Sequence, residues 1–408
     1  MSDTLARLEP YRTDNLILLI GTNPLPNYVA ARLLCAPRGK IHLVCSSGTA
    51  SIAERLEKKL ALDGLHFERR PVLSESRPQE IFSAIREMVM RMHGTVGLHY
   101  TGGTKAMSVH AYRAVKEVHS DAVCSYLDAH DLKMVIDRGM GDGRDDEIPV
   151  GKAVTLTVRE IARLHKIEFE KSRDRPLLLD VARALQKDFE SGKQWLSWVE
   201  QNLMTLQNKR KPKPANELRT KPMPSGEFPE LGQTFMNLGA PVDATLEDWA
   251  IATCEFPNSS DGLKEFVGWL AGGYWLESIA LDALLQIKES CELDDCGMGY
   301  VAEQSKFEFD VAATRGYQLF AFSCTTEDKD AMCKQKLFEG FERAKQMGGD
   351  EARTALVCYN RDPVNLLNKF KRENFFAEGT VRVFGANHMQ DLPRYLAEWI
   401  NNHKRRQS

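Results

Sequence analysis

The amino-acid sequence predicts an α/β protein with two α/β units and a mainly helical region between them. Residues 15–140 alternate short apolar runs with amphipathic stretches, which is typical of βα units around a parallel sheet. Residues 208–224 contain four prolines and six basic side chains, so we expect a linker or an exposed loop there. From Asp261 onwards, an amphipathic helix precedes a second set of strands. These three observations define the predicted architecture.

The N-terminal unit is expected to alternate strands and helices in a regular order. Its strands are the apolar runs at residues 16–21, 40–45, 96–100 and 123–127, with residues 133–136 pairing beside the last one. Its helices are the segments in which apolar side chains recur at helical spacing, namely residues 27–34, 50–62, 81–92 and 106–118. Residues 139–146, rich in glycine and acidic side chains, mark the expected end of this unit.

The rest of the chain is expected to be helical first and mixed afterwards. Helices are predicted at residues 155–166 and 177–190, before the proline-rich loop. The C-terminal unit should contain a helix that opens at residues 272–277, strands around 299–325, a long helix over 331–347 and a strand over 355–359. We therefore divide the chain into residues 1–145, a helical linker region over 146–262 that includes the basic loop, and residues 263–408.

Composition excludes several classes of protein. The chain has 408 residues and a formal net charge of −3, and such a length corresponds to about two or three domains. A near-neutral chain does not coat nucleic acid by bulk electrostatic attraction, so any contact with nucleic acid is expected to be local. No apolar run reaches the ~20 residues that a membrane-spanning helix needs. No secretory signal is readable, and we expect a cytoplasmic protein without membrane contact.

The cysteines do not suggest a metal or disulfide framework. Nine of them are scattered along the chain without a CxxC pair. Zinc ribbons and disulfide frameworks need closely spaced or paired cysteines, so the sequence argues against both. We expect reduced, mostly buried thiols.

Three polar turns follow predicted strands, and together they predict an anion-binding rim. Ligands of open parallel sheets bind beyond the carboxyl ends of the strands, where backbone amides of tight turns and helix N-termini face them. The Rossmann GxGxxG and P-loop GxxxxGK[ST] patterns are absent, which disfavours ordinary NAD or ATP binding. The alternative is that the paired glycines only turn the chain and Lys105 is a solvated surface lysine. The candidate turns are Thr22-Asn23-Pro24, Ser46-Ser47-Gly48-Thr49 and Thr101-Gly102-Gly103-Thr104-Lys105.

Acidic side chains in the C-terminal unit predict a divalent metal site. Glu277 lies beside the buried face of a predicted helix, and Glu308 and Asp310 share one face of a strand because side chains alternate there. After a turn at Arg315-Gly316, residues 317–325 should return antiparallel and complete a hairpin. Hard cations prefer oxygen ligands, and phosphodiester hydrolysis needs a metal that activates water. The alternative is a solvated acidic strand face.

The N-terminal unit resembles a known family. The segments LIGTNPLPNY (19–28) and HYTGGTKAMS (99–108) are similar in wording and place to the CRISPR-associated Rossmann-fold sensor domain, abbreviated CARF, over about residues 14–140. The resemblance implies a dimer whose two copies form one symmetric pocket for a cyclic oligoadenylate. It implies a pocket lined by Thr22, Asn23, Pro24, Asn27, Thr101, Gly102, Gly103, Thr104, Lys105 and Met107. Weaker candidates for the lining are Ser46, Ser47 and Thr49.

The C-terminal unit resembles the PD-(D/E)xK nuclease fold over roughly residues 264–360, in particular CARF-linked nucleases with a GGxWLE helix and an E-[apolar]-D-V strand. The resemblance implies Glu277 and Asp310 as metal ligands, together with a main-chain carbonyl that Cys324 can supply. The usual E-x-K reads Ser323-Cys324-Thr325, so a carboxylate and a lysine are missing. Glu308 is a substitute carboxylate, and the following helix offers substitute lysines as point charges. These lysines are Lys329, Lys334 and Lys336.

These observations lead to one functional hypothesis and its alternatives. We expect a homodimeric, Mn²⁺- or Mg²⁺-dependent nuclease of type III CRISPR defence, activated by a cyclic oligoadenylate of four adenylates, that cleaves DNA, RNA or both. The alternatives are a CARF transcriptional regulator with a DNA-reading helical region, or a pseudo-nuclease that binds without cutting. A sensor that slowly cleaves its own activator is a third possibility.

Two further groups of residues each have two interpretations. Contact with a substrate or a position in a solvated loop explains the basic residues Lys209, Arg210, Lys211, Lys213, Arg219 and Lys221. Base stacking or core packing explains the tryptophans Trp195, Trp198 and Trp249.

Overall fold

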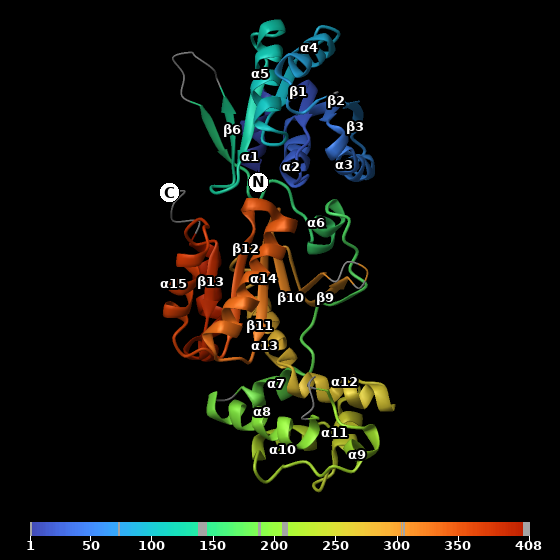
Figure 1. The fold of residues 1–408 in the computed structure, drawn as a ribbon, viewed down its shortest axis with the longest axis vertical. Coiled ribbons are helices and arrows are strands. Elements are labelled where there is room, and N and C mark those ends of the chain that lie inside the picture. Colours follow the sequence, from blue (N-terminus) through green and yellow to red (C-terminus); the bar gives the residue numbers. More distant parts are fainter. Residues whose placement is uncertain are drawn as a thin grey trace.

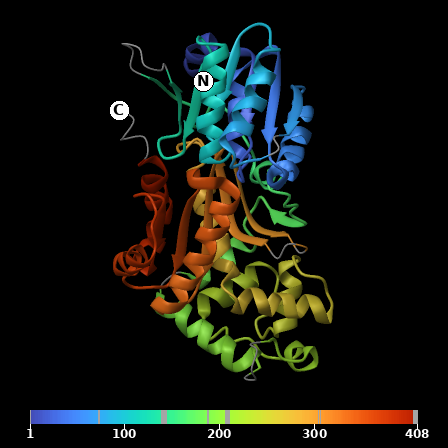
Figure 2. The same cartoon turned by 45° about the horizontal axis from the view of Figure 1, so that its top comes forward.

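A computed structural model gives the fold of the protein and describes residues 2–71, 74–137, 145–186, 189–205, 211–302, 304 and 307–402. The molecule is elongated, and three parts follow one another along its long axis (Figure 1). An N-terminal α/β unit lies at one end, a second α/β unit occupies the middle, and a group of helices lies at the other end. Figure 2 shows the same succession from a second direction.

The N-terminal unit is built on a seven-stranded sheet in the order β3-β2-β1-β4-β5-β6-β7. The strands from β3 to β5 are parallel, and β6 and β7 are antiparallel additions at one edge. The chain moves from β1 to β2 on one side and later to β4 on the other, so β1 lies at the point where the strand order reverses. The strands are β1 (Thr13–Leu19), β2 (Cys35–Cys45), β3 (His66–Pro71), β4 (Val96–His99), β5 (Val123–Asp128), β6 (Lys133–Asp137) and β7 (Asp146–Pro149).

Helices cover both faces of this sheet. On one face, Ile17, Leu19 and Leu98 pack against α4 and α5, and on the other face Leu16, Leu18 and Leu43 pack against α2 and α3. Burial of apolar side chains on both faces is typical of a doubly wound parallel sheet. The helices are α1 (Ser2–Leu8), η1 (Glu9–Tyr11), α2 (Leu25–Leu34), η2 (Ser47–Thr49), α3 (Ala50–Leu62), α4 (Pro78–Val89) and α5 (Lys105–Val118).

The middle unit is built on a six-stranded sheet in the order β13-β12-β11-β10-β9-β8. β11, β12 and β13 are parallel, whereas β8 to β11 are antiparallel neighbours, so the expected hairpin is present as β10 and β11. One face packs on α13 and α16, and the other on α14 and α15. The strands are β8 (Lys171–Arg173), β9 (Asp295–Ala302), β10 (Phe307–Arg315), β11 (Gln318–Thr325), β12 (Arg353–Cys358) and β13 (Val381–Phe384), and the helices are α13 (Tyr274–Gln286), α14 (Asp330–Gly348), η4 (Gly349–Glu351), α15 (Pro363–Glu373), η5 (Ala386–Asp391) and α16 (Leu392–Asn401).

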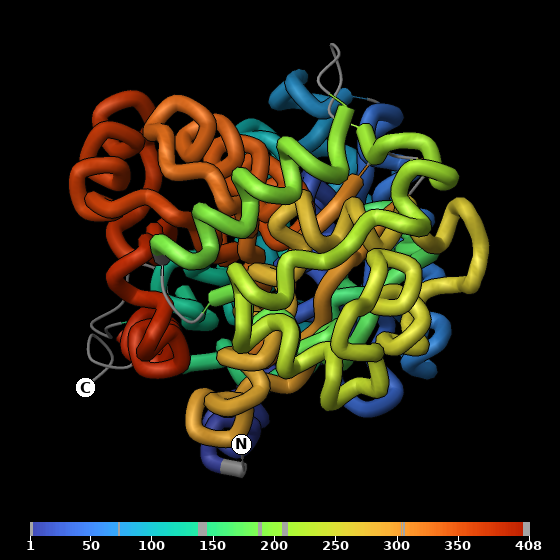
Figure 3. Tube along the Cα trace, turned by 90° about the horizontal axis from the view of Figure 1, so that it is seen from below, coloured from blue at the N-terminus to red at the C-terminus, as the bar shows by residue number. Residues whose placement is uncertain are grey.

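The third part consists of helices, which Figure 3 shows spread across that end of the molecule. Its core is aromatic: the rings of Phe235 and Trp249 stack with centroids 3.9 Å apart, and Trp195 stacks on Trp249 at 6.3 Å. Both tryptophans are buried, so core packing rather than base stacking explains them. The helices are α7 (Leu179–Leu185), α8 (Phe189–Leu203), α9 (Ala215–Arg219), α10 (Pro229–Asn237), α11 (Leu246–Thr253) and α12 (Ser260–Ala271).

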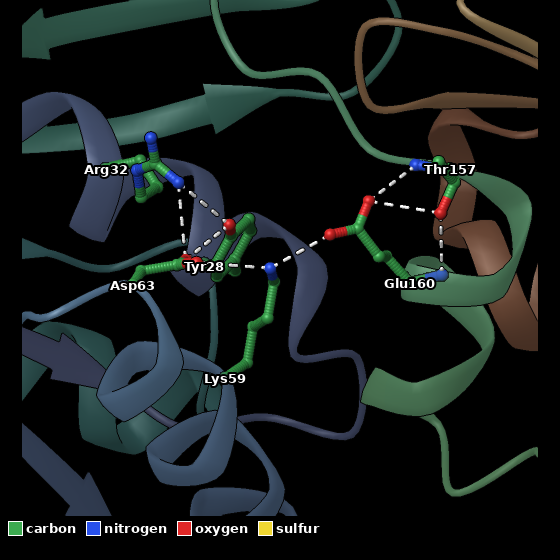
Figure 4. Close-up of polar contacts among 6 residues, drawn as sticks. All are labelled: Tyr28, Arg32, Lys59, Asp63, Thr157 and Glu160. Carbon is green, nitrogen blue, oxygen red and sulfur yellow. Dashed lines mark hydrogen bonds and ion pairs between the residues drawn. The ribbon is translucent and has the colours of Figure 1, made fainter.

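A polar network joins the N-terminal unit to α6 (Val158–Leu164), the helix that precedes the middle unit. The Lys59 ammonium lies 3.2 Å from a carboxylate oxygen of Asp63 and 3.1 Å from one of Glu160. Burial raises the pKa of Asp63, but hydrogen bonds from Tyr28 and Lys59 outweigh it and hold that pKa below its usual value. Figure 4 shows the members of this network: Tyr28, Arg32, Lys59, Asp63, Thr157 and Glu160.

Some elements differ from those predicted. The helix expected at residues 177–190 is divided, because α7 ends at Leu185 and α8 begins at Phe189. β7 and β8 lie inside the predicted helical linker region, and they are strands because each hydrogen bonds to an existing sheet edge. Such short segments carry little periodicity of their own. Residues 139–144 of the expected boundary and 208–210 of the basic loop lie outside the described residues. The division at 145 and 262 stays a prediction.

All nine cysteines are free, and Cys254 is the exposed one among them, as expected for reduced thiols. Among the helices that the structure describes, none has the length and apolar character of a membrane-spanning segment.

Candidate functional site

The turns after β1 and β4 lie against each other at the carboxyl edge of the N-terminal sheet. A Cβ atom added to Gly102 would lie 2.1 Å from the carbonyl oxygen of Leu19, and one added to Gly21 would lie 3.0 Å from the amide nitrogen of Gly103. Only glycine permits such a close approach of two backbones. The two sequence motifs, which are about 80 residues apart, therefore form one surface at the point where the strand order reverses, which is where ligands of open α/β sheets bind.

Two of the expected lining residues lie behind this surface. Asn27 is completely buried, and its side-chain amide donates a hydrogen bond of 3.0 Å to the carbonyl of Leu19. Met107 is 1% exposed and packs in the core between the sheet and α5. Both residues support the turns from inside. Pro24 is also buried, at the start of α2.

The exposed part of the surface is polar. Thr22, Thr101, Thr104 and Lys105 are exposed, and Asn23, Gly102 and Gly103 are half-buried. Thr104 caps α5, because its hydroxyl accepts a hydrogen bond of 3.2 Å from the Met107 amide. Lys105 is the first residue of α5 and forms no ion pair within the described ranges. The lysine and the helix N-terminus both favour an anion, as predicted for a phosphate-bearing ligand. We call Thr22, Asn23 and residues 101–105 the rim.

The third turn lies next to the rim on the neighbouring strand, β2. The amide of Ser46 donates to the hydroxyl of Thr49 at 3.0 Å, and the two hydroxyl oxygens are 3.3 Å apart. These side chains therefore hold the turn itself, and Ser46 is buried. Ser47 is exposed and stays a candidate contact.

The second candidate site lies where the β10–β11 hairpin stops pairing. The ladder extends from Arg315 and Gln318 to Val311 and Phe322, and Asp310 is the next residue of β10. A carboxylate oxygen of Asp310 accepts a hydrogen bond of 2.7 Å from the backbone N–H of Cys324. In an extended strand the N–H and C=O of one residue point to the same edge. The carbonyl of Cys324 is therefore on the side of Asp310, as the predicted ligand set requires.

Glu277 lies in the first turn of α13 and is only 6% exposed. Its pKa is raised well above the ordinary value by burial and by the negative charges of Asp310 and Glu308. Burial also raises the pKa of Asp310, although Lys336 and the Cys324 N–H partly offset it. Within the described part of the chain no salt bridge neutralises Glu277 or Asp310. The buried carboxylate of Glu277 and the half-buried carboxylate of Asp310 repel each other, so a cation would stabilise the ionised state of this site.

The donor atoms fit a hard divalent cation. Carboxylate and carbonyl oxygens are the ligands that Mg²⁺ and Mn²⁺ prefer. No group of three His, Cys, Asp or Glu side chains suited to a metal occurs in the residues that the structure describes. The predicted set of Glu277, Asp310 and the Cys324 carbonyl needs only two side chains, and Glu308 lies two residues before Asp310 on the same strand.

The structure separates the three candidate lysines. Lys336 is exposed on α14, and its positive charge lowers the pKa values of both Glu277 and Asp310. Lys334 instead forms an ion pair of 2.6 Å with Glu373 of α15. Lys329 precedes the first residue of α14. Of the three, Lys336 is the one whose charge acts on both predicted metal-ligand carboxylates.

Arg343 is a site residue that sequence analysis did not predict. Its guanidinium donates a hydrogen bond of 3.2 Å to the backbone carbonyl of Glu308, and its charge lowers the pKa of Asp310. Lys336, Gly340 and Arg343 follow one face of α14 at helical spacing. A Cβ added to Gly340 would lie 2.5 Å from the hydroxyl oxygen of Ser323. The small residues at both positions let α14 approach β11 closely, which brings its cationic side chains to the hairpin.

Basic residues of the proline-rich segment form ion pairs and hydrogen bonds within the helical part. Arg219 pairs with Glu247, Lys221 donates to the side-chain oxygen of Asn202 at 2.8 Å, and Lys213 donates to a backbone carbonyl at 3.4 Å. Lys209 and Arg210 lie outside the described residues. Lys213, Arg219 and Lys221 are half-buried and stabilise the helical part through these bonds, which differs from the solvated loop that the sequence suggested.

The rim and the middle unit touch. A Cβ added to Gly349 would lie 2.1 Å from the side-chain nitrogen of Asn23 and 2.5 Å from a carboxylate oxygen of Glu351. Gly349 directly follows α14, the helix that carries Lys336. One helix therefore connects a rim residue to the carboxylate site.

Solved structures share this fold over nearly the whole chain. Protein VC1899 from Vibrio cholerae is 15% identical, has a TM-score of 0.67, and matches over 95% of this chain and 98% of its own. Can2 from Sulfobacillus thermosulfidooxidans, solved in complex with cyclic tetra-adenylate, is 14% identical, has a TM-score of 0.66, and matches over 95% and 99%. No protein-family model and no curated protein matches the chain. The likeness confirms the predicted fold class.

Proposed function

We propose that this protein is a metal-dependent nuclease that a cyclic oligoadenylate switches on in type III CRISPR defence. The observation that carries the proposal is the meeting of Glu277, Asp310 and the Cys324 backbone at the end of one hairpin. The fold shared with a complex of Can2 and cyclic tetra-adenylate supports the activator class. The resemblance of the two rim motifs to CARF sensors supports it independently of the structure comparison.

The activator is held at the rim. A cyclic oligoadenylate presents a ring of phosphates, and the α5 N-terminus with Lys105 and the amides of Gly102 and Gly103 suits such an anion. The CARF resemblance implies that two copies of the chain complete one symmetric pocket. We therefore propose a homodimer with one activator molecule between the two N-terminal units.

The nuclease chemistry belongs to the middle unit. A bound Mn²⁺ or Mg²⁺ supplies an activated water and polarises the scissile phosphate. Glu277 and Asp310 supply carboxylate oxygens, and the Cys324 N–H fixes the orientation of Asp310. Lys336 stabilises negative charge on the phosphate, in place of the lysine missing from the usual motif. Arg343 holds β10 through the Glu308 carbonyl.

Activation is transmitted from the rim to these residues. A ligand shifts an equilibrium only by its different affinity for two states, so the rim must differ between the inactive and active arrangements. Asn23 contacts the segment that directly follows α14, and α14 carries Lys336 and Arg343. We propose that activator binding shifts α14 along this connection and adjusts the cations at the carboxylate pair.

The test is a cleavage assay with the full chain. Supercoiled plasmid, single-stranded DNA and single-stranded RNA are incubated with Mn²⁺ or Mg²⁺ and with cyclic tetra-adenylate, cyclic hexa-adenylate or no activator. We expect cleavage that requires the activator and the metal, and that falls at least about 100-fold in Asp310→Ala. The matched control is Glu265→Ala, an exposed acidic residue of α12, which should cleave like the wild type.

Binding is measured beside cleavage. Tight binding of cyclic tetra-adenylate without cutting of any substrate would retain the sensor and contradict the nuclease. Cutting that persists in Asp310→Ala would show that the reacting groups lie elsewhere.

A further inference from the structure

Tyr274 lies beside the carboxylate pair, on the same helix as Glu277. It is the first residue of α13, one helical turn before Glu277, and its side chain is 46% exposed. The pKa of its hydroxyl is raised by burial and by the charges of Glu277, Glu308 and Asp310. The ring is therefore uncharged at neutral pH and lies near the groups proposed to cut.

The ring is held in place by the two glycines before it. A Cβ added to Gly272 would lie 2.8 Å and 2.9 Å from two ring carbons of Tyr274, so the ring lies against the Gly272 backbone. Gly273 adopts a φ of 81°, which favours glycine. The Gly-Gly pair thus fixes one aromatic ring with part of its surface open to solvent.

The structure gives this ring no evident structural task. Its hydroxyl makes no hydrogen bond to the residues that the structure describes, and the ring is one of the exposed large apolar side chains among them. A large, fixed, partly exposed aromatic side chain beside a phosphodiester-cleaving site has an obvious ligand in the flat face of a nucleobase.

We propose that Tyr274 stacks on a base next to the scissile phosphate and makes single-stranded nucleic acid the preferred substrate. The inference rests on the proposed nuclease function. In a duplex, neighbouring bases cover both faces of each base, so a base must leave the stack before it can meet a protein ring. In single-stranded DNA or RNA the face is available, and every base offers one, so the contact favours single strands without selecting a sequence.

The first experiment measures stacking without cleavage. The full chain carrying Asp310→Ala is titrated, with cyclic tetra-adenylate and Mg²⁺, into single-stranded DNA that contains 2-aminopurine at successive positions. We expect quenching of the fluorophore at one or two positions. Adding Tyr274→Leu should remove this quenching and weaken binding about tenfold. Adding Tyr274→Phe instead should leave the quenching and the binding affinity unchanged, because the ring is kept. Phe375→Leu, which changes a fully exposed aromatic residue of another loop, is the matched control.

The second experiment measures strand preference with the cleaving enzyme. Tyr274→Leu should lower the cleavage rate of single-stranded DNA and RNA about tenfold and change the rate on duplex of the same sequence less than about twofold. Unchanged quenching, affinity and single-strand preference in Tyr274→Leu would overturn the inference, as would the absence of quenching in Asp310→Ala. Tyr274-dependent quenching with a wild type that never cuts would leave the inference standing and contradict the nuclease. Cleavage by Tyr274→Leu with an unaltered strand preference would contradict the inference and leave the proposed nuclease function standing.

Discussion

At the scale of single residues, the buried carboxyl groups are the most informative feature of this protein. Glu351 lies at the contact between the N-terminal and middle units and is 3% exposed. One of its carboxyl oxygens has no hydrogen-bond partner among the described residues. Burial raises the pKa of Glu351 to about 7. An uncompensated buried carboxyl is costly once it is ionised.

We predict that Glu351→Gln stabilises the protein above neutral pH. The folded state keeps the proton of Glu351 up to about pH 7, whereas the unfolded chain loses it near the ordinary value of 4.5. The contribution of this group to stability is therefore fully present below about pH 4.5 and is lost as pH rises through about 7. At pH 8 the variant should exceed the wild type by roughly 2 kcal/mol in the free energy of unfolding.

Thermal or urea unfolding at pH 5 and pH 8 measures this difference. The free energies of unfolding of the wild type and Glu351→Gln should be similar at pH 5 and should differ at pH 8. Equal stability at pH 8 would mean that Glu351 is paired or solvated in the folded state.

At the scale of elements, α14 is the helix on which both the proposed metal site and its proposed regulation depend. It lies on the face of the middle sheet opposite α13, and Gly340 lets it approach β11 closely. Arg343 donates a hydrogen bond to the Glu308 carbonyl of the hairpin, and the charges of Lys336 and Arg343 both lower the pKa of Asp310. Lys334 instead pairs with Glu373 of α15. In the proposed nuclease, this helix supplies the positive charge that the altered Ser323-Cys324-Thr325 motif lacks.

We predict that two neighbouring lysines of α14 respond differently to the same substitution. Lys336→Ala should lower the rate of activated cleavage about 100-fold, because a charge next to the scissile phosphate is lost. Lys334→Ala removes only the ion pair with Glu373 and should change the rate less than about threefold. Rates at saturating activator and substrate give the comparison. Equal losses in both variants would show that α14 acts through its stability and not through a charge at the site.

At the scale of the whole molecule, the contact between the rim and the segment after α14 joins the two proposed functions. The side chains of Asn23 and Glu351 both face Gly349. Asn23 also accepts a hydrogen bond of 3.0 Å from the Leu25 amide through its side-chain oxygen, which aspartate can reproduce. This position therefore permits a substitution that changes the contact between units without removing the local turn.

We predict that Asn23→Asp impairs activation and that Glu351→Gln restores it. Two carboxylates facing Gly349 repel each other, so the variant should be less stable by about 1 kcal/mol at pH 8 and should cleave more slowly at saturating activator. Removal of the second charge in the double variant should restore both properties. Asn216→Ala, an exposed asparagine of α9, is the control.

Direct binding of cyclic tetra-adenylate separates two explanations. A slower rate at full occupancy supports transmission through this contact. A weaker affinity with an unchanged maximal rate would mean that Asn23 only binds the activator.

The sequence by itself determined most strands and helices of the N-terminal unit, the positions of the polar turns, and the helix and strand that carry Glu277 and Asp310. These features depend on local periodicity and on glycine-containing turns, which neighbouring residues control. The tertiary structure alone decided that Asn27 and Met107 lie behind the rim, that the charge of Lys336 rather than that of Lys334 acts on the carboxylates, and that Arg343 bonds to the strand of Asp310. It alone brought Asn23 to Gly349, more than 300 residues away in the chain. Such contacts depend on how helices pack on sheets and units on each other, and no local pattern specifies that packing.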